Sequence, residues 1–194
     1  MKRLRVGNDP TGIAVSKDGQ ILVGSRRARL SEYGVPLETD LVGFDSEYDR
    51  VTKRIPMANA YLIENIAFTP ASDVALTTLI RPKNNIPSVQ VEGGWMMTHG
   101  IGLLENKPNG KIAQLLIDEP NSYYPDPFDI VVSPDGKKAF VSSSGVDMIS
   151  AIAIDSLRNL MKNPTQNELD RLANDLGASR SFVIGRIKTG AGPK

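Results

Sequence analysis

The sequence predicts an all-β fold built from repeated four-stranded antiparallel sheets. Two observations support this prediction: short runs rich in Val and Ile are separated by turn-forming residues, and the same turn pattern recurs along the chain. Apolar runs between such turn residues are typical of antiparallel strands. The repeat is clearest in residues 126–154, where a turn at 134–136 and a loop at 143–147 separate three apolar runs.

Each repeat begins with a first strand that ends in a hydroxyl residue and a tight turn. The equivalent hydroxyl positions are Ser16, Thr69 and Ser133. Three further apolar runs follow each turn. The second strands are expected at 21–23, 74–79 and 139–141, the third at 41–44, 101–104 and 149–154, and the fourth at 51–55, 112–117 and 182–187.

Units of four strands in succession are the pattern of β-propeller blades. The sequence therefore predicts a β-propeller segment of about three blades, over residues 10–56, 57–119 and 120–190. Propellers close with about four to eight blades, so three leave an incomplete ring with two uncovered sheet faces. The end at 186–193 resembles the start at 4–10, which indicates a further blade beyond residue 194. The alternative is a complete small β protein that buries its ends in another way.

A small helical insertion is predicted at about residues 155–178, between the third and fourth strands of the last unit. Thr165 and Glu168 have the spacing of a capping box, and Gly177 is expected to end the second helix. We expect the insertion to pack on its own propeller, with docking of a partner domain as the alternative. The two apolar helix faces comprise Leu157, Leu160 and Met161, and Leu169, Leu172 and Leu176.

Composition and charge exclude several classes of function. The formal net charge of +1 gives no field that favours nucleic acid or an anionic membrane. The chain has no Cys, which removes disulfides, thiolate catalysis, Cys-ligated zinc and covalent c-type haem. Its apolar runs are far shorter than the ~20 residues that span a bilayer, and its basic start is not a signal peptide. The sequence thus predicts no nucleic-acid partner, no membrane span and no cofactor in this chain.

Alternating strand directions place the long, chemically rich loops on one side of the sheets. We call this side the loop face, and the opposite side, with the tight turns and the helical insertion, the turn face. Loops held by a rigid scaffold often carry function, so the loop face is the expected site. Its segments are 8–11, 25–38, 56–62, 80–97, 119–127 and 143–147.

Basic and aromatic residues make the loop face a candidate binding surface. Arg presents a planar fork to carboxylate or phosphate, and aromatic rings offer amphipathic contact area. The alternative is that the Arg residues pair with Asp and Glu of adjacent loops and that the rings fill loop cores. The candidate binding residues are Arg26, Arg27, Arg81, Lys83, Trp95, His99, Tyr123, Tyr124 and Asp126.

No catalytic residue and no metal site are predicted. His99 is the single histidine, and a His-led triad needs an orienting carboxylate and a nucleophile that the spacing does not establish. We expect His99 to form a hydrogen bond at a strand edge. Asp126, Asp129 and Asp147 lie near turns and could offer oxygen ligands to a hard cation, but they lack EF-hand spacing.

The third unit resembles the repeat of the YVTN family of seven-bladed propellers. The matching pieces are Ile130–Lys137, which includes the Ser-Pro-Asp-Gly-Lys turn, Phe140–Ser143 and Ile149–Asp155. The Thr-Asn pair of the family's strand is absent, and the middle unit lacks the Asp-Gly turn. This resemblance implies the propeller fold and no particular activity.

A narrower resemblance rests on residues 75–83, 94–102 and 116–127, which look like propellers fused to, or partnered with, di-haem c-type cytochromes of the peroxidase type. It implies a periplasmic or otherwise extracytoplasmic location, with haem on a partner or fused domain. The expected function is a non-catalytic module that gives a binding or docking surface to a protein partner, a c-type cytochrome being the candidate, in an electron-transfer system. The alternatives are a metal-dependent propeller lactonase or hydrolase, and a surface scaffold that binds proteins or glycans.

Overall fold

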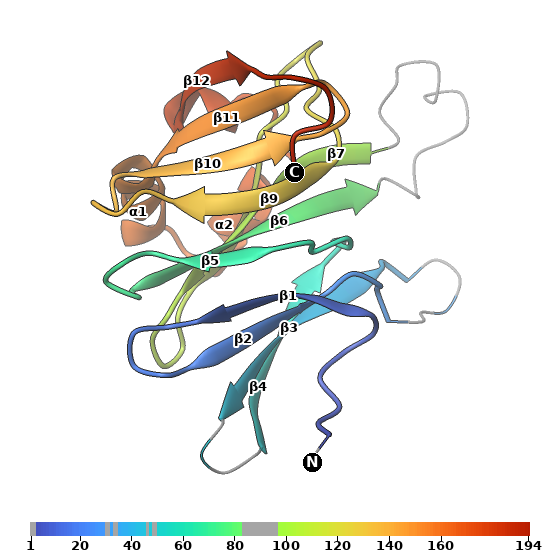
Figure 1. Cartoon of the computed structure of the whole chain (residues 1–194), viewed down its shortest axis with the longest axis vertical. Helices are drawn as coiled ribbons and strands as arrows, with labels where there is room; N and C mark the ends of the chain where they lie inside the picture. The colour runs from blue at the N-terminus through green and yellow to red at the C-terminus, as the bar shows by residue number, and fades with distance from the viewer. Residues whose placement is uncertain (1–2, 30–31, 33–34, 46, 48–49, 83–96) are drawn as a thin grey trace.

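The computed structural model describes residues 3–29, 32, 35–45, 47, 50–82 and 97–194. Within these residues the chain forms three four-stranded antiparallel sheets, arranged side by side as in an incomplete propeller ring (Figure 1). The strands of each sheet follow one another in chain order, as an up-and-down blade requires. The prediction of an all-β, propeller-like fold is confirmed.

The strand bounds agree closely with the expected apolar runs. The first sheet contains β1 (Pro10–Val15), β2 (Ile21–Ser25), β3 (Glu38–Asp45) and β4 (Arg50–Ala58). The second contains β5 (Ile66–Phe68), β6 (Val74–Pro82), β7 (Met97–Glu105) and β8 (Ile112–Leu116). The third contains β9 (Pro127–Val132), β10 (Lys138–Ser143), β11 (Met148–Ala153) and β12 (Val183–Lys188). Ile154, expected to end a strand, instead begins a helix.

The repeated turn is held by the same contacts in all three sheets. The backbone N–H of each hydroxyl residue donates across the turn to the start of the second strand, over 2.8 Å at Ser16, 3.0 Å at Thr69 and 2.9 Å at Ser133. The hydroxyl of each also donates to an Asp carboxylate within the turn. The middle turn, which lacks Asp-Gly, places Ser72 at φ 58°, where the others place glycine.

Two apolar layers fill the spaces between the sheets. One cluster joins the first sheet to the second, and the other joins the second sheet to the third and to the helices. Ile66 of β5 belongs to the first cluster and Ile130 of β9 to the second, with exposed fractions of 4% and 1%. Their repeat equivalent, Ile13 of β1, is 64% exposed because no described sheet precedes the first.

The helical insertion consists of α1 (Ile154–Lys162), α2 (Gln166–Leu172) and the 3₁₀ helix η2 (Ala178–Ser181). Leu157 and Met161 of α1 and Leu169 of α2 are buried in the second cluster, so the expected packing on the propeller is confirmed. The capping box is also confirmed: Thr165 accepts from the Glu168 N–H, and the Glu168 carboxylate accepts from the Thr165 N–H at 2.7 Å.

The prediction that Gly177 ends the second helix is wrong. Helix α2 ends at Leu172, and Ala173 is its C-terminal cap. The following residues form consecutive turns, in which Asp175 N–H donates to the Leu172 carbonyl at 3.1 Å and the Asp175 carboxylate accepts from Gly177 N–H at 2.7 Å. Gly177 has φ −80°, so the chain does not use the left-handed freedom of glycine there.

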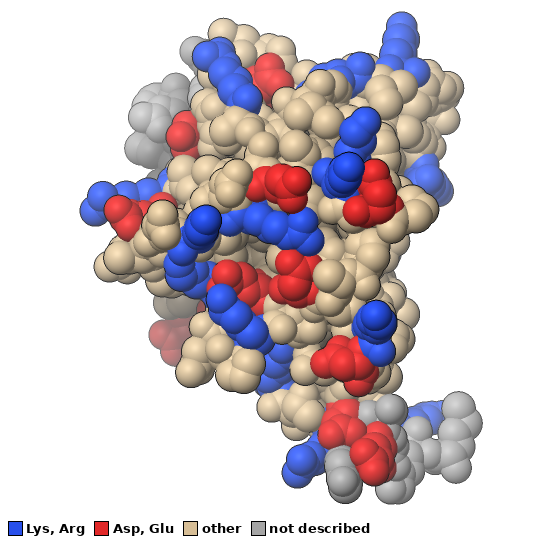
Figure 2. Space-filling model, turned by 90° about the vertical axis from the view of Figure 1, so that its left-hand side faces the viewer, with Lys and Arg blue, Asp and Glu red and all other residues tan. Residues whose placement is uncertain are grey.

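The two faces of the sheets differ as the strand directions predict. The turns before β2, β6 and β10 lie on the left of Figure 1 with α1, while the ends of β6 and β10 point to the opposite side. Figure 2 views the turn face and shows acidic and basic side chains interspersed over it. None of the helices in the described part of the chain is both long and apolar enough to cross a membrane.

Candidate binding face

Two arginines of the loop face are paired with carboxylates of neighbouring segments. Arg26, just after β2, places Nε 2.8 Å from Oε1 of Glu64, whose side chain is 13% exposed. Arg27 places Nε 3.5 Å from Oδ2 of Asp9, and these side chains are 79% and 40% exposed. The two guanidiniums therefore engage different carboxylates in this structure, which is the pairing that the sequence offered as the alternative to a shared anion site.

Arg81 at the end of β6 is in a different environment, because its side chain is buried. Its Nη1 donates to the Ala58 carbonyl at 3.2 Å and to the Gln114 side-chain oxygen, while Gln114 Nε2 donates to the same carbonyl at 2.9 Å. Burial lowers the pKa of Arg81, and the negative charge of Asp170 opposes that effect. Arg81 thus joins the first and second sheets through neutral acceptors.

His99 is oriented by a buried carboxylate that the sequence analysis did not single out. Asp118 is fully buried two residues after β8, and its Oδ2 accepts from the His99 backbone N–H at 2.8 Å and lies 3.1 Å from the ring Nδ1. Its Oδ1 accepts from the Tyr124 N–H at 2.8 Å. His99 therefore does form a hydrogen bond where the β7–β8 ladder ends, and Asp118 fixes both the ring and the following loop.

Tyr124 lies against a second residue that the sequence analysis missed. The Cζ of Arg186, on β12, stands 3.5 Å from the centroid of the Tyr124 ring, which is a cation–π geometry. Arg186 Nη2 also donates to the Ile117 carbonyl at 2.6 Å and to Glu119 Oε1 at 3.0 Å. The Tyr124 ring is thereby part of the contact between the second and third sheets.

The remaining candidate binding residues are not brought together with the others into a single site. Tyr123 is half-buried in the same connection, and Asp126 is exposed, with φ 54° and a carbonyl that accepts from Ser144 N–H at 3.1 Å. Burial, followed by the charge of Asp126, raises the pKa of Tyr61, so these two side chains share one region of the loop face. Lys83 and Trp95 lie outside the described residues.

The expected carboxylates have structural partners. Asp129 accepts from the Ile130 N–H at 2.7 Å and from the Asn65 side-chain amide, and Asp147 accepts from the Gly192 N–H at 2.8 Å. Within the described ranges, no three His, Asp or Glu side chains come close enough together to hold a metal ion. The arrangement can orient a loop surface for binding. Among the described residues, no side-chain hydroxyl forms a hydrogen bond with the His99 ring.

The three sheets and the loop face define a propeller-like module. No family model matches the sequence. Among known proteins the chain is similar to hydrazine synthase subunit beta of Kuenenia stuttgartiensis, with 29% identity over 185 residues, which is 95% of this chain and 46% of that protein.

Among solved structures the chain is similar to the hydrazine synthase of Kuenenia stuttgartiensis, with a TM-score of 0.83 and 27% identity over 93% of this chain and 50% of that one. The chain therefore spans about half the length of the relatives it matches. The β-propeller domain of Cps50 (Swd1) from Myceliophteria thermophila, at 9% identity and a TM-score of 0.29, is too dissimilar to support an argument.

Proposed function

We propose that this chain is a non-catalytic propeller module of a multi-subunit enzyme similar to hydrazine synthase, in which it supplies docking surfaces to other polypeptides. One observation carries the proposal: the likeness to hydrazine synthase subunit beta extends over 95% of the chain and is matched by a TM-score of 0.83 to a hydrazine synthase structure. The relative is named as a subunit, which supports a role in an assembly.

The open side of the first sheet supports a docking role. Ile13 and Val15 alternate along β1 and therefore point to the same face, and they are 64% and 61% exposed. At the equivalent positions of the second and third sheets, the first of these residues is buried against the preceding sheet. Exposed apolar patches of this kind mark interaction sites. We propose that a further propeller sheet, supplied by another polypeptide of the assembly, covers this face.

The nature of the partner is a further part of the proposal. Segments 75–83, 94–102 and 116–127 resemble propellers that accompany di-haem c-type cytochromes, and this chain has no Cys to bind c-type haem covalently. We therefore propose that haem is carried by a partner or fused domain and that the assembly works in the periplasm or another extracytoplasmic compartment.

Isolation of the native protein from its source cells, through a small affinity tag, tests this function. The complex is sized under native conditions, and its subunits are separated on a gel stained for protein and for covalent haem. We expect a stoichiometric assembly far larger than the 21.1 kDa of this chain, with a haem-positive polypeptide in it. A protein that runs alone as a monomer of that mass would contradict the module, and a stoichiometric assembly without haem would contradict the cytochrome partner.

A pair of variants locates the docking face. Ile13→Asp with Val15→Asp places two charges on the open side of β1 and should dissociate the assembly or prevent its formation. Val131→Asp is the matched control, because Val131 is 52% exposed on β9 of the third sheet. Equal recovery of the assembly with both variants would show that the open face of β1 is not a docking surface.

A further inference from the structure

A cavity beside Arg81 has the features of a ligand site. Its volume is about 370 Å³, and it is lined by residues of β4 and β8 and by α2 with the residues behind it. Arg81 contributes a side chain that is 94% buried, since its exposed fraction is 6%. Two sheets and the helical insertion thus converge on one buried positive charge.

The described residues use only part of the hydrogen-bonding capacity of Arg81. A guanidinium has five N–H donors in a planar fork. Both donors of Nη1 are satisfied, by the Ala58 carbonyl and by the Gln114 side-chain oxygen. Among the described residues, Nε and Nη2 have no acceptor, and no carboxylate forms an ion pair with the side chain. A planar carboxylate matches the two unused donor groups of such a fork.

The electrostatics favour an external anion at this position. Moving a charge out of water is costly unless an opposite charge compensates it. Both acceptors that the described residues offer to Arg81 are neutral. Burial lowers the pKa of Arg81, although an arginine keeps its proton in proteins. A bound carboxylate would supply the missing counter-charge and would be held by charge-assisted hydrogen bonds.

The rim of the cavity adds a second, opposite charge. Asp170 of α2 is exposed at the rim, and its Oδ1 accepts from Gln166 Nε2 at 2.9 Å. Its charge acts on Arg81, yet the two side chains do not form an ion pair. A ligand between them would meet a cation at the base and a carboxylate at the rim. Asp170 disfavours a simple anion and favours one that carries an ammonium group.

We propose that this cavity binds a small amino-carboxylate, with the carboxylate on Nε and Nη2 of Arg81 and the ammonium group toward Asp170. The site is independent of the docking role proposed above. It lies between the first and second sheets, so an occupant would also strengthen the contact between them. Amide side chains of Asn59, Gln166 and Asn174 at the lining offer further hydrogen bonds to the ligand.

Titration calorimetry on the purified full-length protein tests the proposal with three probes. Glycine carries both charged groups, acetate carries only the carboxylate, and N-acetylglycine mimics the C-terminus of a peptide. We expect glycine to bind at millimolar concentration and both other probes to bind at least about tenfold more weakly. Absence of glycine binding would overturn the proposal, and N-acetylglycine that binds as tightly as glycine would assign the site to the C-terminus of a partner chain instead.

Two variants test the contributions of Arg81 and Asp170 to ligand binding separately. Arg81→Lys keeps a cation and its stem but loses the planar fork, so glycine affinity should fall at least about tenfold while the thermal unfolding curve stays cooperative. Asp170→Asn changes an exposed residue and should remove the preference for glycine over N-acetylglycine. Asp9→Asn is the control, because it removes an exposed carboxylate that does not line the cavity and should leave all three affinities unchanged. Unaltered glycine binding by a folded Arg81→Lys protein would refute the assignment.

Discussion

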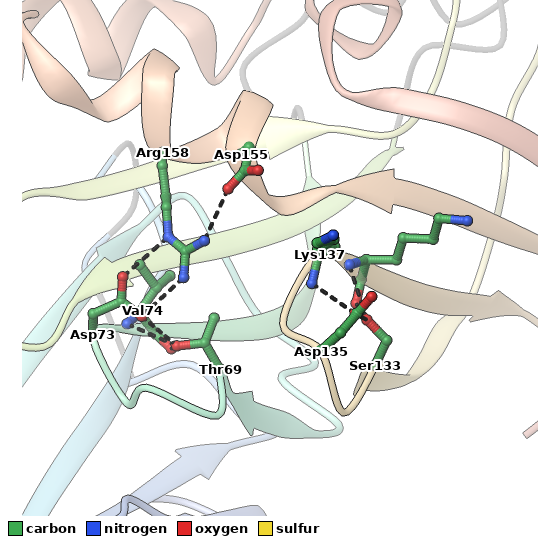
Figure 3. Close-up of polar contacts among 9 residues, drawn as sticks. Thr69, Asp73, Val74, Ser133, Asp135, Lys137, Asp155 and Arg158 are labelled. Atoms are coloured by element: carbon green, nitrogen blue, oxygen red, sulfur yellow. Dashed lines mark hydrogen bonds and ion pairs between the residues drawn. The ribbon is translucent and has the colours of Figure 1, made fainter.

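Arg158 of α1 forms a two-pronged contact with Asp73, in the turn before β6. Its Nε donates to Oδ2 at 3.0 Å and its Nη2 donates to Oδ1 at 3.1 Å, while Thr69 Oγ1 donates to the same Oδ1 at 2.6 Å (Figure 3). The helical insertion of the third sheet is thereby tied to the repeated turn of the second. A surface helix becomes a link between neighbouring blades.

The link predicts a measurable coupling between the two residues. Asp73→Asn and Arg158→Gln should each lower the free energy of unfolding, by roughly 1 kcal/mol, because the side chains are 47% and 34% exposed and solvent screens the pair. Urea denaturation of both single variants and of the double variant measures the coupling. We expect the double variant to lose less than the sum of the two, and strict additivity would show that the contact contributes nothing.

The same carboxylate predicts a pH dependence. Burial raises the pKa of Asp73, but hydrogen bonds from Arg158 and Thr69 and the charge of Arg158 together hold it below its usual value of 3.8. A lowered pKa in the folded state stabilises the protein above the unfolded pKa, and that contribution is lost as the pH falls through the folded pKa. The stability difference between the native protein and Asp73→Asn should therefore be constant near neutral pH and shrink below about pH 4.

Urea denaturation at several pH values, with both proteins in the same buffers, checks this expectation. Asp45→Asn is the comparison variant, since Asp45 lies at the end of β3 in the first sheet and takes no part in the Asp73–Arg158 contact. A difference for Asp73→Asn that persists undiminished at strongly acidic pH would mean that the carboxylate charge is not what stabilises the turn.

The fold could be predicted because its signal is periodic and local. Ser16, Thr69 and Ser133 recur with the same apolar run before and after each turn, and the turn contacts recur with them. The end of a helix depends more on contacts with the rest of the protein than on the residues at that end. Gly177 looked like a stop in the sequence, but the chain leaves the helix at Leu172 and buries Leu176 in the turns that follow. The end of α2 therefore follows the burial of Leu176 and not the conformational preference of Gly177.

The loop-face contacts could be predicted only in part, because most depend on register and on contacts between sheets. The β7–β8 ladder pairs Gly100 with Leu116, and beyond it the Ile117 N–H donates to the His99 carbonyl at 2.9 Å. Asp118, the next residue, is thereby brought to the His99 backbone N–H. Arg186 of β12 contacts the Tyr124 ring in the connection between β8 and β9, and the sequence spacing of the two residues does not indicate this contact. A carboxylate directly after a buried strand, beside the strand of the single histidine, was the available signal for Asp118.

Asp118 should be among the residues whose loss costs most. Its carboxylate is fully buried and accepts from the His99 and Tyr124 backbone N–H groups while it contacts the His99 ring. Asp118→Ala leaves these donors without a partner, so the free energy of unfolding should fall by about 2–4 kcal/mol. Chemical denaturation measures the loss, with Asp9→Asn, at an exposed carboxylate, as control at about 0.5 kcal/mol or less. Similar small losses in both variants would contradict the anchoring role of Asp118.

The turn glycines provide a matched pair for separating backbone strain from packing. Gly19 has φ 83° and Gly136 has φ 69°, so alanine is strained at both and should cost about 1–2 kcal/mol of unfolding free energy. A Cβ at residue 19 would meet nothing within 4 Å, whereas one at residue 136 would lie 3.2 Å from Cδ of Pro70 in the neighbouring turn. Gly136→Ala should therefore cost more than Gly19→Ala, because it also presses the third sheet against the second. Thermal or urea denaturation of the two variants gives the comparison, and an equal or smaller loss for Gly136→Ala would show that the Pro70 contact relaxes without cost.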